Sequence, residues 1–196
     1  MTDIRELLEK YGAVRHGHFL LSSGLHSHQY FQCALVLQHP EATAELARRM
    51  VADLKPGPVD VVIGPAIGGI VLAYELARQL NARALFAERE EGRMKLRRGF
   101  ELAPGERVLV TEDVVTTGGS AREVVELVRE MGATPIGVVA IVDRSGGRVS
   151  FEVPFHALLV TKVSSYRPEY CPLCQEELPL VKPGSRETKP VQALQS

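Results

Sequence analysis

Short apolar runs alternate along the chain with longer stretches in which apolar residues recur every three or four positions. The runs, rich in valine, isoleucine and leucine, predict strands buried on both faces of a sheet. These strands cover residues 59–63, 82–87, 108–110, 135–142 and 155–163. The longer stretches predict amphipathic helices over residues 1–12, 40–55, 68–80 and 121–131. The alternation predicts an α/β domain with a mainly parallel central sheet flanked by helices.

Composition narrows the class of protein. Of the 196 residues, 45% are hydrophobic and 24% are charged, which is ordinary for a globular domain with a sizeable core. The net charge of −1 gives no basic field, so we expect no nucleic-acid partner. No apolar run approaches the roughly 20 residues that span a bilayer, and residues 1–12 do not form a signal peptide. We therefore expect a cytoplasmic enzyme without a membrane partner.

The stretch VLVTEDVVTTGGS, residues 108–120, carries the strongest chemical signal. A buried strand leads to two acids, Glu112 and Asp113, and the chain then enters a loop rich in hydroxyls and glycines before a helix. Backbone N–H groups at a helix N-terminus bind anions, and glycine lets the backbone approach them closely. The acids would repel a phosphate but suit ribose hydroxyls or a hydrated cation. The motif therefore predicts a sugar-phosphate site.

A second glycine-rich loop, GPAIGG at residues 64–69, joins the strand 59–63 to the helix that follows. Because the carboxyl ends of parallel strands meet at one edge of a sheet, both loops are expected at the same edge. Two anion cradles suit a ligand that carries phosphates at two ends.

The stretch 108–120 resembles the phosphoribosyl pyrophosphate (PRPP) motif of type I phosphoribosyltransferases. The block FLLSSGLHSHQYF, residues 19–31, resembles the segment of orotate phosphoribosyltransferases that covers the base. The resemblance implies a type I phosphoribosyltransferase fold over residues 1–163, with a small hood mainly in residues 1–35. Residues 164–196 would form a C-terminal extension. Many relatives have lysine in the position of Ser22 and proline in that of His28, so the contacts of that lysine are not carried over.

The resemblance also implies a reaction, in which orotate and PRPP give orotidine 5'-monophosphate and pyrophosphate, with magnesium, during UMP biosynthesis. Glu112 and Asp113 would be catalytic, hold the ribose hydroxyls and place magnesium through water and PRPP, without direct protein ligands to the metal. The remaining PRPP-binding residues would be Val114, Val115, Thr116, Thr117, Gly118, Gly119, Ser120, Ala66, Ile67 and Gly68. The Ala66–Ile67 bond corresponds to one that is often cis.

Arg144, which follows the aspartate at the end of the strand 135–142, matches an arginine that faces the carboxylate of orotate. Tyr30 and Phe31 would close over the ring, with Thr116 also contacting the base. Residues 88–100, EREEGRMKLRRGF, are either an exposed charged hairpin or a mobile cationic lid. In the family a lid at this place carries catalytic and pyrophosphate-binding cations and reaches the neighbouring subunit of a dimer. The cations available here are Arg89 and Lys95, taken as catalytic, and Arg97 and Arg98, taken as PRPP-binding.

Two alternatives stay open. One is a purine phosphoribosyltransferase of the same fold, against which the hood sequence and Arg144 argue. The other is a non-catalytic PRPP-sensing regulator, which would be expected to carry a basic face or an added DNA-binding domain.

The tail contains CPLC at residues 171–174, with the spacing of half a zinc site or of a redox pair. A second pair is absent and no histidine cluster follows, so two ligands close a tetrahedral site only if a second subunit supplies two more; we expect a small turn with reduced thiols. His18, His26 and His28 are each expected to be solvated. From about residue 182 onward the composition predicts disorder.

Overall fold

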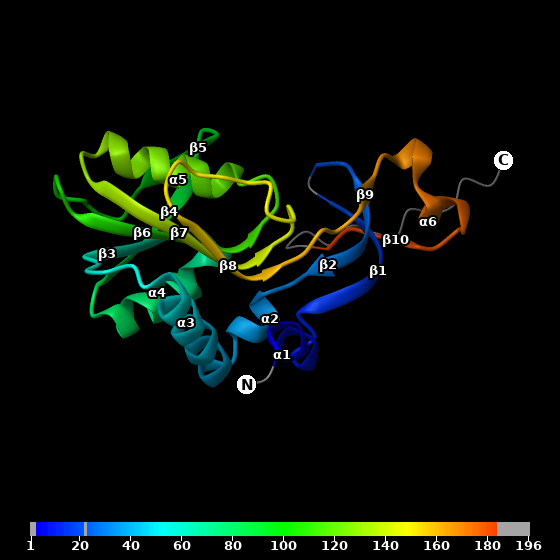
Figure 1. The fold of residues 1–196 in the computed structure, drawn as a ribbon. Helices are drawn as coiled ribbons and strands as arrows, with labels where there is room; N and C mark the ends of the chain where they lie inside the picture. Colours follow the sequence, from blue (N-terminus) through cyan, green and yellow to red (C-terminus); the bar gives the residue numbers. More distant parts are fainter. Residues whose placement is uncertain (1–2, 22, 184–196) are drawn as a thin grey trace.

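The structure is a computed structural model that describes residues 3–21 and 23–183. Within these residues the chain forms a six-stranded central sheet and a four-stranded sheet beside it (Figure 1). Residues 184–196, for which disorder is predicted, lie outside the described residues. Among the described residues, no helix is both long and apolar enough to cross a membrane.

The central sheet has the strand order β5-β4-β3-β6-β7-β8. Its parallel strands are β3 (Val61–Pro65), β4 (Arg83–Glu90), β6 (Arg107–Val115), β7 (Thr134–Asp143) and β8 (Phe155–Val160). The short strand β5 (Arg93–Leu96) runs antiparallel to β4 at the edge. The predicted α/β class with a mainly parallel sheet is confirmed.

Helices cover both faces of this sheet (Figure 1). The helices α3 (Pro40–Leu54) and α4 (Gly68–Leu80) pack with Leu109 and Val139 on one face. The helix α5 (Gly119–Glu130) packs with Val108 and Val138 on the other. Because successive residues of a strand point to opposite faces, an uninterrupted apolar run supplies both cores at once.

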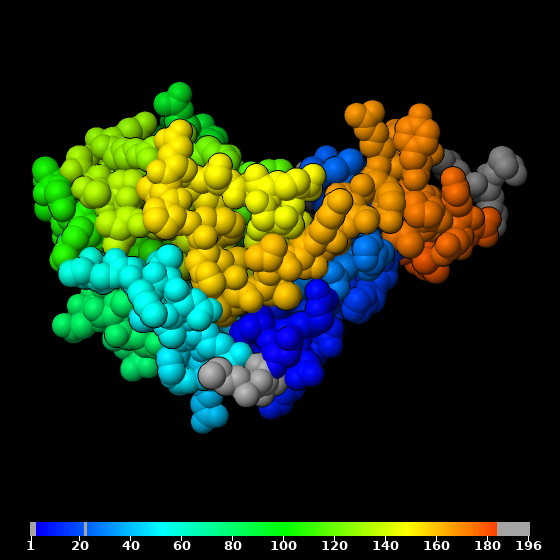
Figure 2. Space-filling view, in the orientation of Figure 1, coloured from blue at the N-terminus to red at the C-terminus, as the bar shows by residue number. Residues whose placement is uncertain are grey.

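The second sheet forms the hood, in the order β10-β1-β2-β9. Its central hairpin is β1 (Val14–Leu20) and β2 (His26–Phe31), flanked in sequence by α1 (Ile4–Lys10) and α2 (Ala34–Leu37). The outer strands, β9 (Ser165–Tyr166) and β10 (Leu180–Val181), come from the C-terminal extension, with η1 (Pro168–Tyr170) and α6 (Pro172–Gln175) between them. The two ends of the chain thus share one sheet, which projects from the main body in Figure 2, where its residues are blue and orange.

Candidate active site

The two acids of the motif lie in the last residues of β6, not in the loop after it. The prediction of a strand over 108–110 was too short, because β6 stays paired with β7 as far as Val115 and Asp143. Glu112 is buried, with 9% of its surface exposed, and Asp113 is half-buried. Burial, with the neighbouring Asp113 carboxylate, raises the pKa of Glu112 to about 9, and burial also raises the pKa of Asp113. Such a pair is costly unless a cation or hydrogen-bond donors are bound beside it.

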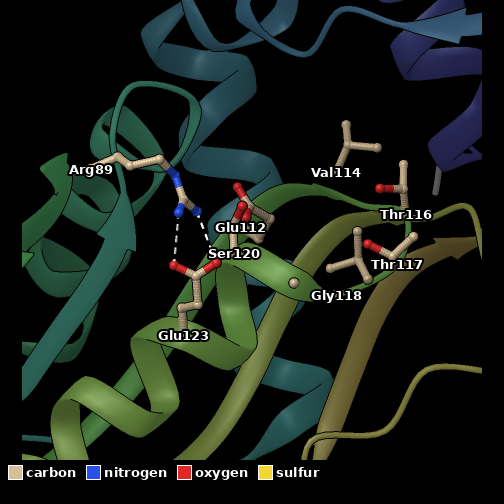
Figure 3. A pocket seen from close by; sticks show the side chains of 10 residues that line it. Arg89, Glu112, Val114, Thr116, Thr117, Gly118, Ser120 and Glu123 are labelled. Carbon is tan, nitrogen blue, oxygen red and sulfur yellow. Dashed lines mark hydrogen bonds and ion pairs between the residues drawn. The ribbon is translucent and has the colours of Figure 1, made fainter. Parts of the chain in front are cut away.

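The loop after β6 opens onto a pocket of about 300 Å³. Glu112, the exposed hydroxyls of Thr116 and Thr117, and the N-terminal end of α5 all lie around it (Figure 3). The described residues that line it are Arg89, Glu112, Val114, Val115, Thr116, Thr117, Gly118, Gly119, Ser120 and Glu123. Hydroxyl and backbone donors next to the first turn of a helix are suited to a phosphate group.

The two glycines of the loop differ in backbone conformation and in the space around them. Gly118 has φ +76°, and a Cβ there would lie 2.7 Å from the side chain of Val149. At Gly119 the nearest atom to a Cβ would be the Thr117 hydroxyl, at 3.8 Å, an ordinary contact. The fold itself therefore requires glycine at Gly118. That both glycines let the backbone approach a phosphate stays a prediction.

We accordingly expect Gly119→Val to weaken PRPP binding while leaving the melting temperature nearly unchanged. Gly118→Ala, the matched control, should lower the free energy of unfolding by about 1–3 kcal/mol, because it combines a strained φ with overpacking. Thermal unfolding and isothermal titration of each variant separate the two effects. A large loss of stability in Gly119→Val would show that this glycine too is structural.

The loop between β3 and α4 lies against Asp113. A Cβ on Gly68 would lie 2.8 Å from the Asp113 carboxylate, so any larger residue would require this carboxylate to move. The Ala66–Ile67 peptide bond is cis, as predicted. Ile67 and Gly68 are exposed beside Asp113, which leaves this second predicted anion cradle accessible.

Arg144 lies directly after β7, and its backbone N–H donates to the carbonyl of Val115 at 2.8 Å. Its side chain is buried, yet no described carboxylate forms an ion pair with it. One guanidinium nitrogen donates to the Ser27 hydroxyl at 3.3 Å, whereas its buried Nε has no hydrogen-bond partner among the described residues. Burial lowers the pKa of Arg144 from its usual range. A buried guanidinium with an unused donor suits an anionic ligand.

The hood brings Tyr30 and Phe31 to this arginine. The Arg144 guanidinium carbon lies 6.0 Å from the centre of the buried Phe31 ring. Burial and the Asp113 carboxylate raise the pKa of the half-buried Tyr30, while Arg144 acts in the opposite sense. Tyr30 is thus close enough to both Asp113 and Arg144 for their charges to affect its pKa. Sequence reasoning missed Ser27, whose contact with Arg144 spans 117 residues and leaves no local pattern.

The cation-rich segment is the β4–β5 hairpin, not a loop. Lys95 donates to Glu90 at 2.8 Å, Arg98 donates to Glu88 at 2.8 and 2.9 Å, and Arg97 pairs with Glu90 at 3.3 Å. Of the four predicted cations, Arg89 alone is among the described residues that line the pocket, where it pairs with Glu123 of α5 (Figure 3). Glu123 carries no signal in the sequence beyond its place on the first turns of α5. The structure therefore agrees with the alternative of an exposed charged hairpin. The role of each cation stays a prediction.

These features agree with comparison to known proteins. The model of the family described as "Phosphoribosyl transferase domain" matches residues 35–153. The chain belongs to this family. The match covers the strands from β3 to β7, both glycine loops and the pocket after β6, that is, the central sheet without its edge strand β8.

Relatives in the phosphoribosyltransferase family match along nearly the whole chain. A protein of Caldanaerobacter subterraneus subsp. tengcongensis named orotate phosphoribosyltransferase is 57% identical over 94% of this chain and 97% of its own length. One of the same name from Thermotoga maritima is 54% identical over 95% of this chain and 100% of its own. The crystal structure of orotate phosphoribosyltransferase from Aeropyrum pernix superposes with a TM-score of 0.69 at 28% identity, covering 81% of this chain and 94% of its own.

Proposed function

We propose that this protein is an orotate phosphoribosyltransferase, which transfers the ribose 5-phosphate of PRPP to orotate in UMP biosynthesis. The observation that carries the base assignment is Arg144, a buried guanidinium with an unused Nε donor and no described carboxylate partner. Orotate differs from uracil by a carboxylate, the group that a planar guanidinium binds with two parallel hydrogen bonds. Relatives of this name at 54–57% identity over nearly the whole chain support the same activity.

The reaction needs positioning and charge stabilisation more than covalent help from the protein. Thr116, Thr117 and the N-terminal backbone of α5 would hold the 5'-phosphate, and Glu112 and Asp113 would accept hydrogen bonds from the ribose hydroxyls. The bond between ribose C1 and the pyrophosphate oxygen breaks, and its electron pair leaves with pyrophosphate. The new bond joins C1 to the ring nitrogen of orotate, which approaches from the opposite face under Tyr30 and Phe31 and gives up its proton to the pyrophosphate that leaves.

The residues present fit a magnesium requirement. Two adjacent carboxyl groups with raised pKa values lie at the end of β6, Glu112 in the lining of the pocket and Asp113 against Gly68, and within the described chain neither is in an ion pair. Carboxylate oxygens are hard ligands of the kind that Mg²⁺ prefers, commonly through its own waters and substrate phosphates. Glu112 and Asp113 would hold such an ion through water. When bound, magnesium would neutralise charge on the pyrophosphate group.

We also propose a homodimer with a shared active site. Ile67, which directly precedes α4, and Val71 and Tyr74 on α4 follow one another at intervals of four and three residues and expose 82%, 48% and 66% of their surfaces. An exposed apolar stripe of this spacing on one helix face is suited to self-association. It begins beside the loop that meets Asp113, so a partner packed there would lie next to the pocket. The partner's β4–β5 hairpin would then supply lid cations.

Tyr74→Asp tests the dimer, because a charge placed in an apolar contact disfavours its burial. Analytical ultracentrifugation should report a monomer for this variant, and its activity should fall because lid cations from the partner are lost. Val160→Asp, at another exposed apolar position, should stay dimeric. A fully active Tyr74→Asp monomer would contradict a shared active site, and an unchanged dimer would contradict the interface.

The function itself is tested by pyrophosphate release from PRPP and magnesium with a panel of bases: orotate, uracil, adenine and hypoxanthine. Release with orotate alone is expected. Release with a purine would assign the protein to the purine branch of the fold. PRPP binding without release for any base would instead identify a sensing regulator.

A further inference from the structure

Four metal-ligand side chains from the two ends of the chain meet in the hood. They are His18 on β1, His26 at the start of β2, and Cys171 and Cys174 around α6. One potential ligand atom from each residue lies within 4.8 Å of the others. The expectation that His18 and His26 are solvated is wrong, since they expose only 3% and 5% of their surfaces, whereas His28 is exposed. The two further ligands that the sequence did not show beside the Cys-x2-Cys pair are therefore supplied by His18 and His26 of the same chain.

The spacing of these atoms is close to that of a tetrahedral site. The Nε2 atom of His18 lies 3.6 Å from each cysteine sulfur, and the Cys174 sulfur lies 3.3 Å from Nδ1 of His26. The two histidine nitrogens are 2.9 Å apart. Around a zinc ion, bond lengths near 2.0–2.3 Å place neighbouring ligand atoms roughly 3.3–3.8 Å apart. Small movements of the side chains are therefore enough to complete the tetrahedron.

The surroundings of His18 prepare it to bind a metal. Its Nδ1 lies 2.8 Å from the carbonyl oxygen of Leu178, an acceptor only, so Nδ1 carries the proton and donates it in this hydrogen bond. This tautomer leaves the lone pair on Nε2, which is the atom directed at the two sulfurs. A ligating histidine characteristically donates its other N–H to a carbonyl or carboxylate in this way.

We propose that His18, His26, Cys171 and Cys174 bind one zinc ion, which fastens the C-terminal extension to the β1–β2 hairpin. Two thiolates and two imidazoles form a closed Cys2His2 set, which is typical of structural zinc and leaves no open position for catalysis. A redox role for the cysteine pair is less suitable, because it would give no reason for two buried histidines to converge on the sulfurs. Exposure of Cys174 leaves a route by which the ion can enter.

The site has a consequence for the hood as a whole. The strands β9 and β10 have two residues each, and each pairs with the central hairpin through only two residue pairs. Such short edge strands hold weakly by themselves. A metal bound between the hairpin and α6 would fix both, together with the β2 residues Ser27 and Gln29, whose oxygens contact Arg144.

The full-length protein, purified under reducing conditions and incubated with zinc, should contain one zinc ion per chain by elemental analysis. Substitution with Co²⁺ should give the visible absorption of a tetrahedral site with thiolate ligands. Cys171→Ser, Cys174→Ser and His18→Ala should each reduce bound zinc to below about one tenth of an ion at micromolar free metal, since each removes one of four ligands. Removal of zinc by a chelator should lower the melting temperature of the unmodified chain.

Matched controls keep the test decisive even if a ligand variant folds poorly. Cys33→Ala and His28→Ala change the same residue types outside the cluster and should retain zinc, as should Asp113→Asn, which probes the acidic pair of the pocket. Reaction of the native chain with a thiol reagent should modify Cys171 and Cys174 only after chelation. Failure of the unmodified chain to bind zinc or cobalt would overturn the proposal, as would equal zinc in all variants or zinc lost only in Asp113→Asn.

Discussion

Asp113→Asn should lower kcat/KM by about 10²–10³-fold, because it removes a fixed charge that, in the proposed reaction, acts on the ribose of PRPP. The change should leave the fold intact. Asparagine has nearly the same shape, so it can still pack against Gly68, and its oxygen can still accept the hydrogen bond that Asp113 receives from the backbone N–H of Val114 at 2.8 Å. Steady-state kinetics with saturating PRPP and with saturating orotate provide the measurement.

Glu112→Gln serves as the companion variant, since Glu112 lines the pocket whereas Asp113 lies against Gly68. Each variant replaces a carboxyl group, whose burial raises its pKa, by a neutral amide, so neither should lose stability in thermal unfolding. Near-normal activity in Asp113→Asn would exclude a role for this carboxylate in the reaction. A fall in activity that merely follows a fall in melting temperature would point to packing instead.

Arg144→Ala is expected to have the second large effect. It should weaken the binding of orotate rather than the binding of PRPP. Loss of a desolvated, charge-assisted pair should cost roughly 2–4 kcal/mol of orotate affinity, or about 30- to 900-fold in Kd. PRPP affinity should change little, because that ligand would use the loops after β3 and β6. Arg144→Lys keeps the charge but not the planar pair of donors, so it should recover only part of the loss.

Arg148→Ala is the matched control for this experiment. Arg148 lies in the same loop but is exposed, and its side chain donates to the carbonyl of Ser145 rather than to the hood. Orotate and PRPP affinities should both survive in this variant. If Arg144→Ala retains orotate binding, or loses both ligands together, Arg144 does not select the base, and the assignment to orotate weakens with it.

The central sheet and the pocket after β6 could be predicted because their signals are local. A buried strand, two acids, a hydroxyl- and glycine-rich loop and a helix follow one another within residues 108–130, and the chain folds them in that order. The position of Arg144 was predicted for the same reason, since it directly follows a buried strand. Its hydrogen bond to Ser27 and the unused Nε depend on the hood and required the structure.

What could not be predicted depends on contacts between distant residues. Gly118 and Gly119 look equivalent in sequence, and only the packing of Val149 against Gly118 separates them. The register of β1 shifts between His16 and Phe19, so simple strand alternation does not give the direction of His18. No local pattern connects His18 with Cys171, whose contact spans 153 residues. The Cys-x2-Cys spacing was the one available signal, and it was insufficient without its partners.

The hood sheet combines strands from distant parts of the chain, and this constrains the order in which the protein can fold during synthesis. All strands of the central sheet lie within residues 61–160 and are joined by local connections, so this sheet can form before synthesis is complete. The first strand of the chain, β1, instead pairs with β10, in which Val181 lies opposite Phe19. Pairing over such a separation is slow, and here it must wait for the last part of the chain. In a newly made chain the loops after β3 and β6 can therefore form first and the complete hood sheet only afterwards.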